Sequence, residues 1–202
     1  MSKEFEANLE DSERIRQLVK RARVLGLQNR ADLPDHVRKI LADADAEGRM
    51  LTADELKQLC LGSNVDASSL ANLQNEANAL VDQAKQTLLA HQPELIRPGG
   101  ALFPSQRAEA CWRDCYHFLR VCCYAVATAQ PKLTDPEGME GLKDLYVAMG
   151  VPIPAMLFAL GELRTLASAS LKTSSHIKEA KLLDAAFLEL ETEIGGFSVK
   201  SY

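Results

Sequence analysis

The sequence predicts an all-α protein. Apolar residues recur at steps of three and four along most of the chain, which is the period of an α-helix with one buried face. Residues that cap or end helices separate these stretches. No sustained alternation of apolar and polar residues and no Asn-Gly or Asp-Gly turn indicates a β-hairpin. The length of 202 residues suits one domain with a full core.

The amino-terminal half is expected to contain four helices. Each follows a residue that caps or opens a helix, and glycines or breaks in the apolar pattern end them. The expected ranges are 12–25, 34–48, 52–62 and 66–91. Thr52 and Glu55 form a capping box at the start of the third helix, and Asp66 can cap the fourth.

The carboxy-terminal half is expected to contain four more helices. A loop rich in proline and glycine, from Gln92 to Ser105, separates it from the first half. The expected ranges are 105–128, 134–150, 155–172 and 176–194. Ser105 can cap the first of these helices. Thr134 and Glu137 form a second capping box, with Pro136 at the first helical position.

Residues 1–32 are expected to form a helical extension on a domain of residues 33–202. Residues 12–25 carry basic side chains around an apolar stripe, although the whole chain is acidic, with a net charge of −5. The stripe consists of Ile15, Leu18, Val19, Ala22 and Leu25. One interpretation is a helix that docks on an acidic partner or an anionic membrane surface. The other is a solvated helix held against the body by charge attraction.

Composition excludes several classes of function. The net charge of −5 argues against binding to nucleic acid, which needs a basic surface. No apolar run approaches the roughly 20 residues that span a bilayer. The acidic, polar start does not resemble a secretory signal. Four of the 5 cysteines crowd into residues 111–123, which favours free thiols in a reducing compartment. We therefore expect a cytoplasmic protein.

One helix gathers groups that could hold a large anionic ligand. At about 100° per residue, three cysteines fall on one face of the helix after the loop, namely Cys111, Cys115 and Cys122. Arg107 lies one turn before Cys111, and Arg113 and Asp114 lie beside it. A thiol can add to an activated double bond, guanidinium groups pair with carboxylates, and a carboxylate accepts N–H bonds from a cationic ring. Cysteines on one helix face are also common in protein cores, so the core interpretation stays open.

Other chemistries have weaker support. Cys111, Cys115 and His117 do not form a zinc pattern, because the histidine points away from the thiols. A haem-binding histidine at His91 or His117 and a cysteine nucleophile with a histidine base remain open. The sequence contains no P-loop and no dinucleotide-binding glycine fingerprint.

Several motifs resemble the phycobiliprotein family. Ile96–Phe103, followed by Arg107–Asp114, is similar to the family's chromophore region, in which a loop of the RPGGN type precedes a helix with the pattern R-x-x-x-C-x-R-D. Gly141–Pro152 resembles the segment that closes the pigment pocket, and Asp45–Leu51 resembles the turn between the two amino-terminal helices. The resemblance extends from about Pro34 to Phe197. Among known types, the sequence is most similar to the allophycocyanin β type. Ala101 and His117 depart from the family pattern, so the chain resembles a divergent paralogue of that type.

This resemblance implies a globin-like core of six helices with two further helices at the front, so about eight helices and the extension. It implies a linear tetrapyrrole, most simply phycocyanobilin, attached through a thioether to Cys111. It also implies that Asp114 contacts the central pyrrole nitrogens, that Arg107 and Arg113 hold the propionates, and that Tyr146 lines the pocket.

The resemblance further implies a partner, an α-type subunit or a homologous chain, bound through the region of Asp45 and Arg120. We expect this charge pair to bridge the subunits. We also expect an apolar face on the front helices to be exposed in a monomer, consisting of Val37, Ile40, Leu41 and Leu51. A linker or a photosystem component could bind residues 12–25.

The implied function is light harvesting and excitation energy transfer in phycobilisomes, at the cytoplasmic surface of the thylakoid membrane. The alternative is a protein of the same fold with altered or no pigment that acts in phycobilisome or photosystem assembly or regulation. We do not expect an enzyme, since no signature of a bilin lyase or thiol enzyme is present.

Overall fold

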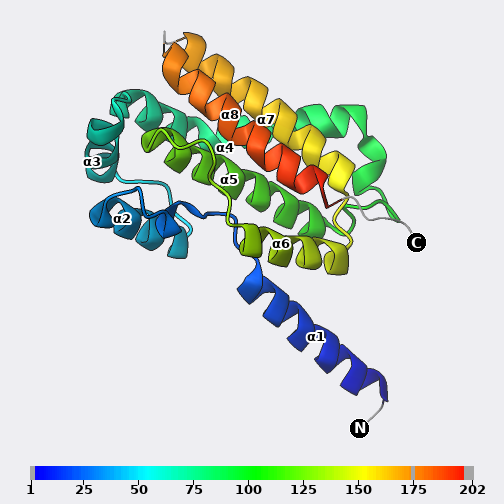
Figure 1. Cartoon of the computed structure of the whole chain (residues 1–202). Helices are drawn as coiled ribbons and strands as arrows, with labels where there is room; N and C mark the ends of the chain where they lie inside the picture. Colours follow the sequence, from blue (N-terminus) through cyan, green and yellow to red (C-terminus); the bar gives the residue numbers. More distant parts are fainter. Residues whose placement is uncertain (1–2, 174–175, 198–202) are drawn as a thin grey trace.

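The computed structural model describes the backbone of residues 3–173 and 176–197, and the side chains of residues 12–172 and 176–197. These residues form eight α-helices and two short 3-10 helices (Figure 1). The α-helices are α1 (Lys3–Arg21), α2 (Asp35–Ala46), α3 (Ala53–Ser63), α4 (Ala67–His91), α5 (Ser105–Ala127), α6 (Pro136–Met149), α7 (Ile153–Thr173) and α8 (Ile177–Gly195). The prediction of an all-α, globin-like fold is confirmed. Within the described ranges, no helix combines the length and the apolar composition needed to cross a membrane.

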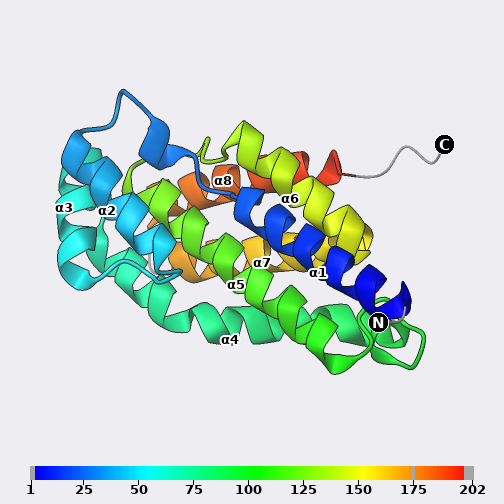
Figure 2. The same ribbon diagram turned by 90° about the horizontal axis from the view of Figure 1, so that it is seen from below.

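The core lies between four long helices. The hairpin of α7 and α8 packs against α4 and α5 (Figures 1 and 2). From Phe118 to Ala127, α5 is buried on all sides, and Tyr124 of this stretch and Phe187 of α8 are among the largest fully buried side chains. The first half of α5 is buried only on one face. The same helix therefore runs from a partly open end, which carries Cys111, into the centre of the protein.

The predicted start signals of α3 and α4 are confirmed. The hydroxyl of Thr52 accepts the backbone N–H of Glu55, and the Glu55 carboxylate accepts the N–H of Thr52, which completes the capping box. Asp66 accepts the backbone N–H of Ser68 at 2.7 Å, at the first turn of α4.

The predicted caps of α5 and α6 are wrong. Ser105 is the first residue of α5, and the cap position belongs to Pro104. At α6, the cap position is Asp135, but its carboxylate receives the guanidinium of Arg23 at 2.9 Å instead of a helix N–H. Thr134 donates its hydroxyl to Glu189 of α8 at 2.8 Å. Partners that are distant in the sequence therefore take the side chains of Thr134 and Asp135.

The chain after α1 belongs to the body. The helix ends at Arg21, earlier than predicted, and an isolated β-bridge then pairs Leu25 with Thr134. Leu25 and Leu27 are fully buried. Whether residues 1–32 form a separate unit stays a prediction, but the segment from residue 24 to 27 is part of the core. The first part of α1 projects beyond α6 (Figure 1).

Two glycines of α6 allow the end of α1 to approach closely. An ideal Cβ on Gly141 would lie 2.5 Å from the carbonyl oxygen of Arg21, and one on Gly138 would lie 2.3 Å from the carbonyl oxygen of Arg23. No side chain fits at such distances unless the backbone moves. α1 is therefore seated directly against the backbone of α6.

We expect Gly141→Ala to destabilise the protein by roughly 1–3 kcal/mol, because the added methyl group overpacks this contact. The melting temperature should fall by about 3–10 °C. Gly161→Ala is the matched control, since it also lies within a helix but its added Cβ meets no atom within 4 Å. It should stabilise the chain by up to about 1 kcal/mol. Thermal melts of both variants test this, and equal shifts would contradict the close contact.

The front helices do not present the predicted apolar face. Val37, Leu41 and Leu51 are buried, because α2 packs against the short helix Leu27–Asn29 and the core. The prediction that they are exposed in a monomer is wrong. Ile40 alone of the four is partly exposed.

Arg120 and Asp45 form their charge pair within the chain, at 2.8 Å. The Arg120 guanidinium also donates to the hydroxyl of Tyr124 at 2.8 Å, and that hydroxyl donates to the carbonyl of Arg49. Only 7% of the Arg120 side chain is exposed. This cluster holds α2 and the following turn against α5, so the pair has a structural role inside one subunit. A role between subunits stays a prediction.

Candidate functional site

A pocket lies between α1, α5, α6 and the turn before α7. Its cavity volume is about 190 Å³. Its lining consists of Ile15, Val19, Leu102, Arg107, Ala110, Cys111, Arg113, Asp114, Leu145, Tyr146, Met149, Val151, Pro152 and Met156. A mostly apolar wall with a few polar groups is typical of a site for an organic ligand. All five residues predicted for pigment binding line this one pocket.

The pocket distinguishes Cys111 from the other cysteines of α5. Cys111 is 5% exposed and forms part of the wall, whereas Cys115 and Cys122 are buried outside it. A hydrogen bond with Cys111, together with burial, raises the pKa of Cys115 well above its usual value, and burial does the same for Cys122. Thiols with a raised pKa stay protonated and are poor nucleophiles. Among the three candidates, the geometry favours Cys111 as the reactive thiol.

Asp114 is a poorly solvated carboxyl group at the inner wall. The hydroxyl of Tyr146 donates to its Oδ2 at 2.9 Å. Burial raises the pKa of Asp114, and the hydrogen bond from Tyr146 and the charge of Arg113 only partly oppose this rise. Burial is also the main cause of the raised pKa of Tyr146. A carboxyl group in this state gains from a ligand that brings cationic N–H donors.

The two arginines lie at the rim. Arg107 donates to the carbonyl of Ala101 at 3.0 Å and to the carbonyl of Gly150 at 2.8 Å, so it joins the loop before α5 to the end of α6. These contacts use two of the five N–H donors of a guanidinium group. Arg113 is exposed and lies nearly two turns further along α5. Both side chains line the pocket.

The sequence motifs did not predict most of the apolar residues that line the pocket. One interpretation of this helix has Ile15 and Val19 facing a partner and the other has the helix held against the body; in the structure both residues line the chain's own pocket. The apolar stripe of residues 12–25 was the available signal, but it did not specify what the stripe would cover. The prediction that this stripe is free for docking is therefore wrong for Ile15. Val19 also lines the pocket but keeps 55% of its surface exposed.

We expect Asp114→Asn to stabilise the pigment-free chain at neutral pH. The raised pKa means that the charged carboxylate costs stability in the folded state, and asparagine keeps an oxygen that can accept the Tyr146 hydroxyl. A gain of about 1 kcal/mol would raise the melting temperature by roughly 2–4 °C. The gain should be complete above the folded-state pKa and vanish as the pH falls through it, because the wild-type carboxyl group then becomes neutral. Melting curves from pH 7 to pH 3 test this, and a loss of stability at pH 7 would contradict it.

Comparisons with known proteins give one family. The family model described as phycobilisome protein matches residues 39–190, which is more than half of the chain. The C-phycocyanin beta chain of Aglaothamnion neglectum is 29% identical over 163 residues, covering 79% of this chain and 93% of the relative. The C-phycocyanin beta subunit of Arthrospira platensis is 32% identical, covering 67% of this chain and 80% of the relative.

A third relative, the C-phycocyanin beta subunit of Synechococcus elongatus, is 36% identical over 121 residues, covering 58% of this chain and 70% of the relative. These three relatives are phycocyanin β chains, so the allophycocyanin-like subtype stays a prediction. The family match spans all of α4, α5 and α6, and therefore includes the body of the pocket but not α1. On its sequence, its fold and the extent of the match, the chain belongs to the phycobilisome protein family.

Proposed function

We propose that this chain is a bilin-binding, light-harvesting subunit that carries a linear tetrapyrrole on Cys111. Membership of the phycobilisome protein family supports the general function. The observation that carries the specific assignment is one pocket containing a thiol, a poorly solvated carboxyl group and two guanidinium groups at its rim. The residues present fit such a ligand, which is long and apolar with a central row of N–H groups and two carboxylates.

Cys111 provides the covalent link. With a linear tetrapyrrole in the pocket, this thiol would add across one of its exocyclic double bonds, so that the sulfur would form one carbon–sulfur bond and the thiol proton would go to the neighbouring carbon. No atom leaves and no oxidant is needed. When bound, the tetrapyrrole supplies the absorption of visible light and an excited state that can pass its energy to a neighbour.

The other groups hold the ligand still. Asp114 accepts N–H bonds from the pyrrole rings, and Tyr146 fixes the orientation of its carboxylate. Arg107 and Arg113 pair with the propionates at the rim. The apolar wall excludes water and restricts twisting. Restricted motion favours loss of the excitation by transfer or emission over loss as heat.

The finer assignments follow from the relatives and the surface. We propose phycocyanobilin as the pigment, because the relatives named above are phycocyanin chains. We propose an α-type subunit as partner, through the surface around Asp45 and Arg120, and a position at the cytoplasmic surface of the thylakoid. A linker or photosystem partner for residues 12–25 would have to use the charged side of α1, because the apolar side is directed to the body.

A second candidate is a pigment-free protein acting in assembly or regulation. Two observations favour it. Arg107 is already bonded to two backbone carbonyls, and α1 contributes apolar side chains to the pocket. A pocket closed by its own helix would suit a protein that keeps the fold without its ligand.

Zinc-enhanced fluorescence in a denaturing gel separates the two candidates. The full-length chain, purified from a pigmented cyanobacterium, should give a bright band, because only a covalently attached bilin survives denaturation. A dark band, beside a bright phycocyanin control, would contradict the light-harvesting assignment and support the second candidate.

A further inference from the structure

We propose that α1 is part of the ligand site: Ile15 and Val19 form its outer wall and shield Cys111 from solvent. This inference rests on the proposed function for the identity of the ligand, although the shielding can be tested without it. The family match begins only at residue 39, so the wall is a feature of this chain outside the matched region.

The carboxy-terminal end of α1 is firmly held. Its last residue, Arg21, lies against the backbone at Gly141 and forms an ion pair with Asp144 at 3.3 Å. Just beyond it, Arg23 pairs with Asp135 at 2.9 Å, and Leu25 is fully buried. These contacts fix where α1 leaves the body and direct the preceding turns over the mouth of the pocket.

The preceding turns are held more weakly. In residues 13–20, for which the structure describes the side chains, hydrogen bonds and ion pairs join members of α1 to one another, as between Glu13 and Arg16 or Gln17. Their contact with the body is apolar and partial: Ile15 and Leu18 are half-buried and Val19 is 55% exposed. A segment with few buried contacts opens at low cost in free energy. The wall can therefore move aside to admit a ligand while its anchor stays in place.

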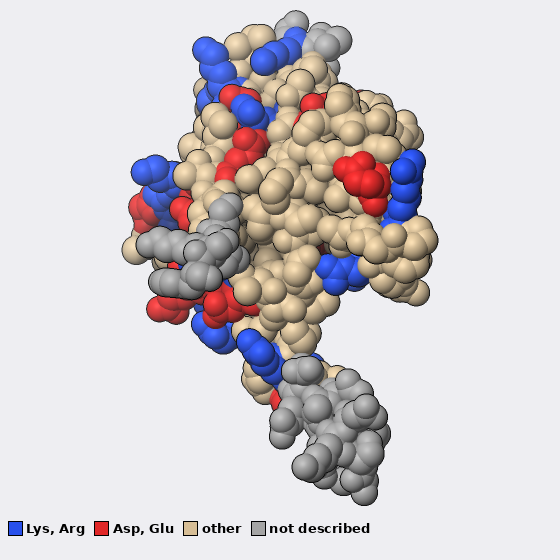
Figure 3. Space-filling view, turned by 90° about the vertical axis from the view of Figure 1, so that its right-hand side faces the viewer, with Lys and Arg blue, Asp and Glu red and all other residues tan. Residues whose placement is uncertain are grey.

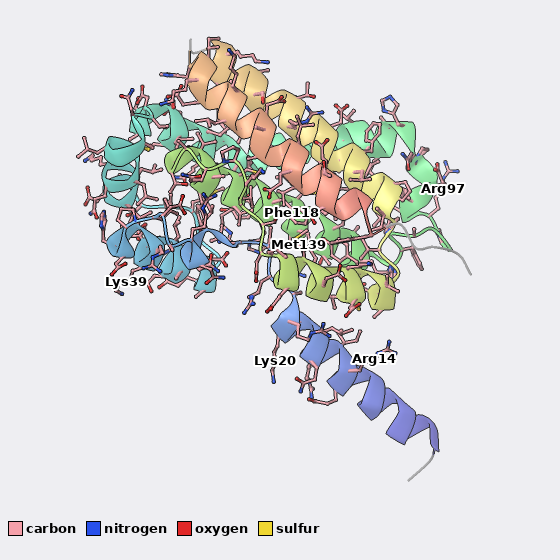
Figure 4. The ribbon with its side chains drawn as sticks, in the orientation of Figure 1. Arg14, Lys20, Lys39, Arg97, Phe118 and Met139 are labelled. Atoms are coloured by element: carbon pink, nitrogen blue, oxygen red, sulfur yellow. The ribbon has the colours of Figure 1, made fainter. Side chains whose placement is uncertain are left out.

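The charges on α1 are consistent with this orientation. Arg14 projects from the side of the helix that faces the body, whereas Lys20 projects from the opposite side (Figure 4). Arg14 is adjacent to Ile15 and so adds positive charge near the wall. In the view of Figure 3, Lys and Arg side chains lie beside uncharged residues where α1 joins the rest of the molecule. An apolar wall with one inward cation suits a ligand with an apolar body and anionic ends.

The test is the rate at which iodoacetamide alkylates Cys111 in the full-length, pigment-free chain. Val19→Asp places a charge on the wall, and Lys20→Asp is the matched control, with the same new side chain at an exposed position of α1 outside the lining of this pocket. We expect Val19→Asp to speed alkylation of Cys111 by roughly threefold or more, because weaker packing increases the open fraction. Lys20→Asp should leave the rate at the wild-type value. Cys122 and Cys123, which are fully buried, report on global unfolding in the same sample.

If Val19→Asp and Lys20→Asp both react at the wild-type rate, α1 does not shield Cys111 and the proposal is overturned. If all cysteines react faster in Val19→Asp, the chain has unfolded. Val19→Asn, a neutral change at the same position, then replaces it, and its rate of alkylation at Cys111 is compared with the wild-type rate. Because the assay contains no pigment, it can support the wall even if zinc fluorescence is absent. Conversely, pigment on Cys111 with unchanged alkylation rates would leave the proposed function intact and reject the wall.

Discussion

Replacing Cys111 by serine is expected to remove all covalent pigment from the chain. The thiol is the only group of this side chain that can form the thioether, and the serine hydroxyl is a far weaker nucleophile. Zinc-enhanced fluorescence of the denatured variant should fall to the background of the gel. The helical circular dichroism should be unchanged, because serine is close in size to cysteine and the side chain lies at a pocket wall.

The matched control is Cys115→Ser, one helical turn away on the same face. Its thiol lies outside the pocket lining and contacts the sulfur of Met156 at 4.0 Å. This variant should keep its pigment, although a hydroxyl group in that buried position will lower the melting temperature. Pigment retained by Cys111→Ser and lost from Cys115→Ser would show that the wrong thiol has been assigned.

Replacing Arg120 by glutamate should greatly lower the free energy of unfolding of a single chain. The buried guanidinium holds Asp45, the Tyr124 hydroxyl and, more weakly, the carbonyl of Ala44. Removing one partner of such a pair costs about 3–5 kcal/mol, and placing a second carboxylate beside Asp45 adds repulsion. For a chain of this size, that corresponds to a fall of roughly 6–20 °C in melting temperature.

This outcome differs from that of a charge pair that bridges two subunits, for which Arg120→Glu would weaken assembly more than folding. Arg16→Glu is the control, since 72% of that side chain is exposed and the change should stay within about 0.5 kcal/mol. Melting curves at low protein concentration, where association is minimal, make the comparison. A normal melting temperature with lost association would restore the intersubunit interpretation.

Local signals predicted the helices well. Thr52, Glu55 and Asp66 act within their own first turns, so their caps could be read from a few neighbouring residues. Asp135 has the same local signature, but Arg23, 112 residues away, takes its carboxylate. The early end of α1 has a similar cause, because Leu25 pairs with Thr134 instead of continuing the helix. Long-range partners decide such positions, and one sequence does not reveal them.

The sequence predicted which polar residues belong to the candidate site, but not how the helices arrange them around a pocket. Helical periodicity placed Cys111, Cys115 and Cys122 on one face and could not choose between them. The choice depends on where α5 leaves the core, which is a property of the packed structure. In the same way, amphipathic spacing in α1 indicated an apolar contact without naming the surface it covers.

The most direct measurement of the central claim is tryptic mass spectrometry of the pigmented, full-length chain. Trypsin should place Cys111 in the peptide 108–113, Cys115 in 114–120, and Cys122 with Cys123 in 121–132, so that each candidate site gives a separate peptide. We expect the mass of one bilin on the peptide 108–113 and none on the other two. A bilin on either of the other peptides, or an unmodified 108–113 peptide from chain that fluoresces with zinc, would contradict the assignment of Cys111.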